Sequence, residues 1–250
     1  LFGVHATDDL LKVEFSVLPA DSGPGLDVAI SAAGEAVVAS SNGALGYFAA
    51  ATGKLLQWAK PLDTTGKVLH GIAAYGDGVV ASGYIKVGSA SGGQAGYLVR
   101  YGKDRKVMWE KTYDAGGADY LTEVRALSDG RIAAAGAVSV AGKGWDVRAL
   151  LLGSDGAVFS STTLGSTGNE YPTALAVLKD SRLVVVGHRG DGVNSDGYHA
   201  TVTPWGHAQC VTAGYCADLT VAGCDDKNPC TVDSCAPGKG CTHAAITGCK

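Results

Sequence analysis

The segment 188–197 contains the residues best suited to bind a metal ion. It reads His-Arg-Gly-Asp-Gly-Val-Asn-Ser-Asp-Gly, in which Asp191, Asn194 and Asp196 offer oxygen atoms. Calcium prefers carboxylate and amide oxygens, and glycines allow a loop to wrap an ion. Two similar glycine-rich loops earlier in the chain carry no carboxylates, so the simpler interpretation is a solvated loop, with calcium as the alternative.

A second group of oxygen-bearing side chains lies in the C-terminal tail. Calcium bound there would stiffen a small cross-linked repeat, whereas the simpler interpretation is that Asp and Asn only form turns. The residues concerned are Asp225, Asp226, Asn228 and Asp233.

All seven cysteines lie in this tail. Cys210, Cys216 and Cys224 are followed at the same spacing by Cys235, Cys241 and Cys249, with Cys230 between the two sets. Such a short segment cannot bury a sufficient core, so we expect disulfides and an oxidising compartment. Zinc is the less favoured alternative, because the spacings lack two matching Cys-x2-Cys pairs. The disulfide pairing stays open.

No set of residues indicates catalysis. The segment 88–92 has Ala where a hydrolase elbow needs its nucleophilic Ser. The six histidines lack metalloprotease spacing. A metal site formed by His199, His207 and Cys210 is a less favoured alternative to a disulfide role for Cys210. We therefore expect no enzymatic activity and no cofactor other than calcium.

The rest of the chain is organised around the repeated unit 119–164. Strands are predicted at 121–127, 132–136, 145–152 and 157–163, separated by Asp-Gly turns and a glycine-rich loop. Because its turns and glycines recur at intervals of about 50 residues, the pattern is typical of propeller blades.

The predicted fold class is therefore all-β, a β-propeller spanning residues 1–208. Its four near-complete, four-stranded blades and an N-terminal outer half blade occupy 26–62, 67–113, 119–164, 170–206 and 1–20. We expect an open arc of a larger ring, with a small ring closed by residues 10–18 as the alternative. Residues 209–250 form a small disulfide-rich module.

The composition excludes several classes of protein. With 46% hydrophobic and 18% charged residues the chain can bury a core, and its net charge of −4 without a basic patch argues against nucleic acid. No apolar run is long enough for a membrane span. Because the chain starts at Leu1 and the repeats begin in mid-unit, we expect a piece of a longer secreted protein whose signal is absent here.

Four segments resemble three known families. The blocks 116–136 and 165–187 resemble the propeller-type (delta-60) repeats of bacterial secreted or surface proteins. The sequence Cys-Thr-Val-Asp-Ser-Cys at 230–235 is similar to a cysteine-rich repeat of slime-mould extracellular-matrix proteins. The segment 52–58 is similar to quinoprotein repeats, which implies that Trp58, and less faithfully Trp109, docks one blade on the next.

These patterns together predict a non-enzymatic, extracellular or cell-surface module for display, adhesion or ligand capture. Its partner would be a protein or glycan that binds the blade loops. A quinoprotein-like or hydrolytic propeller enzyme, or its remnant, and a calcium-stabilised matrix protein are the alternatives.

Overall fold

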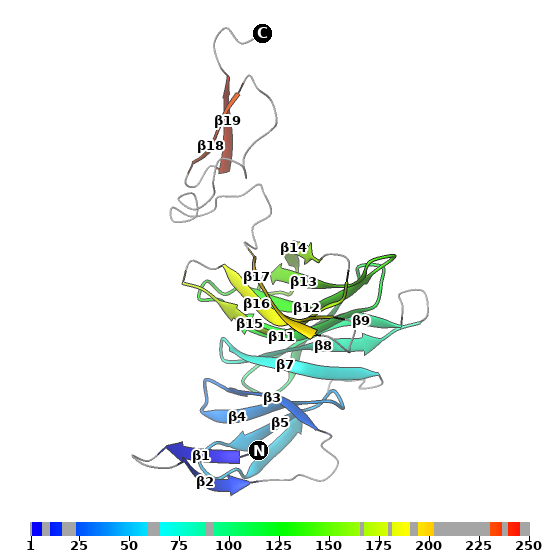
Figure 1. Cartoon of the computed structure of the whole chain (residues 1–250). Coiled ribbons are helices and arrows are strands. Elements are labelled where there is room, and N and C mark those ends of the chain that lie inside the picture. Colours follow the sequence, from blue (N-terminus) through cyan, green and yellow to red (C-terminus); the bar gives the residue numbers. More distant parts are fainter. Residues whose placement is uncertain are drawn as a thin grey trace.

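The structure, a computed structural model, consists of β-strands throughout its described part (Figure 1). It describes residues 2–6, 11–16, 24–59, 66–88, 93–165, 168–179, 182–190, 195–202, 231–236 and 240–245. Within these residues, no helix has the length and apolar character needed to cross a lipid bilayer.

Four antiparallel sheets form successive blades, as predicted. The first blade contains β3 (Gly25–Ile30), β4 (Glu35–Ser40), β5 (Leu45–Ala49) and β6 (Leu55–Ala59). The second contains β7 (Lys67–Tyr75), β8 (Gly78–Lys86), β9 (Gln94–Tyr101) and β10 (Val107–Tyr113). The third contains β11 (Asp119–Ala126), β12 (Ile132–Val140), β13 (Gly144–Leu152) and β14 (Val158–Leu164). The fourth contains β15 (Glu170–Val177), β16 (Leu183–Gly190) and β17 (Ser195–Val202).

Two smaller sheets lie outside the blades. The hairpin of β1 (Phe2–Ala6) and β2 (Leu11–Ser16) matches the strand pair predicted for an outer half blade. The alternative in which residues 10–18 complete the last blade is not seen, because β2 pairs with β1 and no described strand lies beside β17 as a fourth. The tail contains the hairpin of β18 (Thr231–Ala236) and β19 (Gly240–Ala245).

The middle blades bury both faces, which explains their nearly continuous apolar strands. In the second blade, Val79 and Val99 pack with Val37 and Tyr47 of the first. Their chain neighbours point the other way and pack with the third blade. The first and fourth blades lie at opposite ends of the row (Figure 1). Ile30 of the first blade is accordingly 57% exposed.

Each blade has two ends. One end carries the loop between the second and third strands and the linkers to the neighbouring blades, and we call it the linker end. We call the opposite end the turn end. At the turn end, Gly53 and Gly156 adopt positive φ between the third and fourth strands. Arg105 takes this place in the second blade with φ 61, and its guanidinium forms a 2.5 Å ion pair with Glu35 of the first blade. A strained turn thus joins two blades.

Every first strand contains a β-bulge at the same place, which the sequence patterns did not predict. The residues without a cross-strand partner are Leu26, His70, Thr122 and Thr173. First strands of neighbouring blades contact one another, so these residues lie along the inner side of the arc. A bulge re-aims side chains and bends its strand.

The bulge also explains a glycine within the second strand of three blades. A Cβ on Gly83 would lie 1.8 Å from the carbonyl oxygen of Val68, and one on Gly136 equally close to that of Tyr120. A Cβ on Gly187 would lie 2.1 Å from the carbonyl oxygen of Tyr171. In these three blades the glycine therefore leaves room for the backbone of the bulged strand.

We expect stability to depend on pH through the bulge residue His70. Burial against the ring of Tyr84 lowers the pKa of His70, so the unfolded chain binds this proton more readily than the folded one. Stability from His70 is thus present above its unfolded pKa and is lost as pH falls through the folded pKa. Urea unfolding at pH 8 and pH 5 should show a smaller loss for His70→Gln than for wild type. Equal losses would contradict this account.

Candidate functional site

The residues singled out in the sequence are only partly placed by the structure. Asp191 and Asn194 lie outside the described residues, whereas Asp196 belongs to β17, where its backbone pairs with Arg189. Of the tail candidates, Asp233 lies in β18, and Asp225, Asp226 and Asn228 lie outside the described part. Calcium binding at both places stays a prediction.

The tail cysteines are placed in the same incomplete way. Cys235 and Cys241 stand opposite each other in the register of β18 and β19. The others lie outside the described residues: Cys210, Cys216, Cys224, Cys230 and Cys249. Disulfide formation and its pairing therefore also stay predictions.

A pocket of about 390 Å³ opens at the linker end of the second blade. All four strands of the blade contribute to it, because their ends converge there. Its lining consists of Lys67, Ile85, Tyr97, Glu110, Lys111 and Thr112. Charged, hydroxyl and apolar groups thus share one cavity of a size typical of small-molecule sites.

Three polar side chains of this pocket form one hydrogen-bond network. The Lys67 ammonium lies 2.9 Å from Oε2 of Glu110, and the Tyr97 hydroxyl donates to the same oxygen at 2.5 Å. Lys67 also lies over the Tyr97 ring, 5.0 Å from its centroid. The Lys67 side chain is 5% exposed and that of Glu110 is 36% exposed. The network is therefore buried at its base and open at Glu110.

The electrostatics of the network keep Tyr97 as a neutral hydrogen-bond donor. Burial, and then the hydrogen bond to Glu110, raise the pKa of Tyr97 far above its ordinary value. The opposite charges of Lys67 and Glu110 stabilise each other at short range. Tyr97 thus keeps its proton at neutral pH and donates it to the Glu110 carboxylate in a hydrogen bond.

In the third and fourth blades the first residue of the first strand, the position of Lys67, also carries a buried charge. Asp119 begins β11 as Lys67 begins β7, and its Oδ1 lies 2.8 Å from Nη1 of Arg148. Arg148 also donates to the carbonyl of Tyr113 at the end of the second blade. Glu170 begins β15 and pairs with Arg189 at 3.3 Å. An ion pair with a buried member at the linker end therefore recurs in the second, third and fourth blades.

Aromatic rings form a continuous row at the linker end of the third and fourth blades. The ring centroids of Tyr120 and Trp145 are 5.3 Å apart, those of Trp145 and Tyr171 6.5 Å, and those of Tyr171 and His188 5.1 Å. The first three are half-buried and His188 is exposed. Burial raises the pKa of Tyr120 to about 12. We call these four residues the aromatic row.

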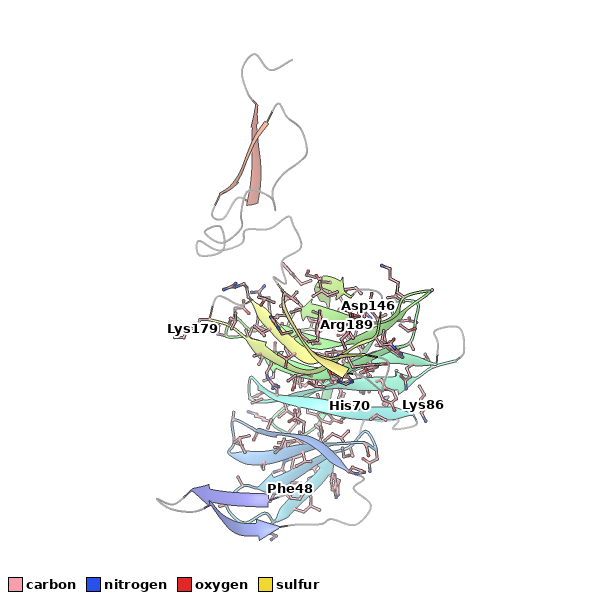
Figure 2. All side chains as sticks on the ribbon, viewed as in Figure 1. Phe48, His70, Lys86, Asp146, Lys179 and Arg189 are labelled. Atoms are coloured by element: carbon pink, nitrogen blue, oxygen red, sulfur yellow. The ribbon has the colours of Figure 1, made fainter. Side chains whose placement is uncertain are left out.

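Two polar residues neighbour the aromatic row in the sequence. Figure 2 shows Asp146 and Arg189 among the third and fourth blades, apart from His70 and Lys86 in the second. The Arg189 side chain is 48% exposed. Asp146 is only 5% exposed, and its Oδ1 has no hydrogen-bond partner among the described residues. Because neighbouring residues of a strand point to opposite faces, both side chains lie on the face away from the rings.

The two tryptophans of the outer strands behave differently. The Trp109 indole donates to the carbonyl of Ser154 in the third blade at 3.1 Å, as expected for a side chain that docks one blade on the next. Trp58 instead packs edge-on against Phe48 of its own blade, with the ring centroids 6.1 Å apart.

No group of three or more His, Cys, Asp or Glu side chains placed to hold a metal occurs in the described ranges. The sequence patterns missed both the pocket and the aromatic row. Lys67 and Glu110 lie in different strands and carry no motif, and the rings are dispersed along the chain. The available signal was the departure of single positions from the repeat.

Comparison with known proteins agrees with this architecture. A family model described as a Dictyostelium (slime mold) repeat matches residues 223–246, in line with the predicted resemblance of the tail. A search of curated proteins finds no match.

Solved structures with a similar fold include a protein from Thermus thermophilus described as a putative oxidoreductase (glucose dehydrogenase). It is 18% identical, with a TM-score of 0.50 over 74% of this chain and 64% of that one. The WD40 β-propeller domain of Doa1 is 12% identical, with a TM-score of 0.44, and the match covers 68% of this chain and 47% of that one. The Pan2 WD40 domain of Neurospora crassa is 13% identical, with a TM-score of 0.48, and the match covers 72% of this chain and 51% of that one.

The chain spans less than two thirds of each of these proteins, and the likeness concerns the fold alone. This chain has an all-β fold whose antiparallel sheets are arranged as propeller blades, followed by a tail similar to the slime-mould repeat.

Proposed function

We propose that the protein is a non-enzymatic binding module that captures a sugar residue in the pocket of the second blade. The observation that carries this proposal is the Lys67–Glu110–Tyr97 network at the base of a cavity of about 390 Å³. Such a network offers fixed hydrogen-bond partners to a ligand without reorganising, which lowers the cost of binding.

The protonation states in the pocket favour binding over chemistry. A general base or nucleophile needs a pKa near the working pH. Tyr97 is instead held neutral by burial and by Glu110, and Lys67 is held in an ion pair. Tyr97 is therefore not suited to act as a base or nucleophile at neutral pH.

The mixed lining of the pocket fits a sugar. Hydroxyl groups of a sugar both donate and accept hydrogen bonds, and its C–H groups form apolar faces. Glu110 offers an acceptor, Lys67 and Lys111 offer donors, and Ile85 and the Tyr97 ring offer apolar surface. A purely apolar or purely anionic ligand would leave part of this lining unmatched.

We place this activity outside the cell or at its surface. The similarity of residues 223–246 to the slime-mould repeat and the dense cysteines of the tail support this location.

Calcium-dependent stability of the tail or the loop 191–196 is a separate expectation. Chelation should then lower the melting temperature, and an unchanged melting temperature would count against it.

Lys67→Met should weaken sugar binding by about tenfold or more, because a hydrogen bond to a charged group contributes about 1.5–3 kcal/mol. The melting temperature of the intact chain is first measured with each member of a panel of mono- and oligosaccharides. The sugars that shift it are then titrated by calorimetry. Thr112→Val serves as a second variant, since it removes a pocket hydroxyl on an exposed strand position.

Lys106→Met is the matched control, because Lys106 is an exposed lysine at the turn end of the same blade. It should bind like wild type. Binding that survives both pocket variants, or a panel without any ligand for the wild type, would contradict the proposed function.

A further inference from the structure

We propose that the aromatic row, Tyr120, Trp145, Tyr171 and His188, is a second binding surface, over which a neutral polysaccharide chain lies. This extends the proposed function, since it assigns a separate surface to the same class of ligand. The row crosses from the third blade to the fourth, so it offers an extended track, unlike the pocket, which lies within the second blade alone.

Comparison with the second blade indicates that blade packing does not require these rings. Arg148 stands opposite Gly136 as Tyr97 stands opposite Gly83. Trp145 lies three residues before Arg148, and its counterpart Gln94 lies three residues before Tyr97. A polar side chain therefore serves at this place in a blade that is otherwise built in the same way.

The two tyrosines of the row also differ from the residue at the same place in the second blade. Tyr120 and Tyr171 each follow the buried charge that begins a first strand, and their counterpart after Lys67 is Val68. All three residues are half-buried. At these two places an aromatic side chain of the row thus corresponds to a smaller side chain in the second blade.

The indole at the centre of the row is held in place across the blade junction. The backbone N–H of Trp145 donates to Oδ1 of Asn169 at 2.9 Å, and Asn169 belongs to the linker that enters the fourth blade. Gly144 permits this approach, because a Cβ there would lie 2.4 Å from the same oxygen. A rigid aromatic anchor loses little conformational entropy on binding.

The surroundings of the row select a carbohydrate as the ligand. Ring faces match the C–H faces of a pyranose, and hydroxyls need donors and acceptors beside them. The hydroxyl groups of Tyr120 and Tyr171 and the exposed imidazole of His188 supply such groups within the row itself. An apolar peptide would leave these polar groups without partners.

The test is native gel electrophoresis of the intact chain through gels that contain soluble xylan, dextran or β-glucan. We expect at least one polymer to retard the wild type, and Trp145→Gln to weaken this retention by about tenfold, as for an anchor residue. Because Gln94 occupies this place in the second blade, the variant should keep a melting temperature close to that of wild type. Tyr171→Val follows the same logic.

Two controls separate this inference from the proposed function. Phe159→Ala removes an aromatic ring that is 51% exposed on the outer strand of the third blade, and it should leave retention unchanged. Lys67→Met should weaken binding of short sugars but keep retention by the polymer. The inference is overturned if no polymer retards the wild type, if Trp145→Gln is retained like wild type, or if Lys67→Met alone removes retention.

Discussion

Replacing Arg148 with methionine is expected to lower the free energy of unfolding by about 3–5 kcal/mol, since this leaves a buried charge without its partner. Asp119 is 1% exposed and Arg148 is 9% exposed, so water cannot replace the lost contact. Burial, only partly offset by Arg148, already raises the pKa of Asp119. The loss should be measured by urea unfolding near neutral pH, and it should shrink as the pH falls below the folded pKa of Asp119, because a protonated carboxyl needs no cation.

The double variant Asp119→Asn with Arg148→Met should recover most of this loss. Asparagine keeps an oxygen for the backbone N–H of Ala115, which now donates to Asp119 at 2.7 Å, and it carries no charge. Arg131→Met is the matched control, since it removes the partner of the more exposed carboxylate of Asp129 and should cost at most about 1 kcal/mol. Equal losses for Arg148→Met and Arg131→Met would show that the buried pair has no special role.

Gly136→Ala is expected to lower the free energy of unfolding by about 3 kcal/mol, the upper end of the usual range for overpacking. The added methyl group would lie 1.8 Å from the carbonyl oxygen of Tyr120 and 2.6 Å from Cα of Leu121. Both atoms belong to the backbone of β11, so relief requires the bulge itself to move. The measurement is chemical unfolding of the intact chain.

Gly88→Ala is the control for this prediction. Nothing lies within 4 Å of a Cβ at Gly88, and this glycine has no positive φ, so its replacement should change stability by no more than about 0.5 kcal/mol. If the two alanine variants are equally stable, the bulge of β11 does not require glycine at position 136 of β12.

The blades were predictable because period-2 apolar strands and Asp-Gly turns are local signals. The predicted strands 132–136 and 145–152 correspond to β12 and β13, which the structure extends to Ile132–Val140 and Gly144–Leu152. The extension of β12 was missed because Gly136 interrupts the run of larger residues, although residues 137–140 still pair with β13. The bulges were missed because they depend on pairing register, which no single strand reveals.

The candidate site was less predictable than the fold. Lys67 and Glu110 are 43 residues apart in the chain and meet only because β7 and β10 end on the same side of the blade. The sequence patterns directed attention to carboxylates in a loop, which are conspicuous in one dimension. Buried polar networks arise from strands brought together by the sheet, and short sequence motifs do not record them.

The most direct test of the account is a crystal structure of the intact chain with the sugar that binds most tightly in the titration. The account predicts a sugar ring in the pocket of the second blade, with hydroxyl groups within hydrogen-bond distance of Lys67 Nζ and the Glu110 carboxylate. A sugar bound elsewhere on the blades, with only solvent between Lys67 and Thr112, would contradict it.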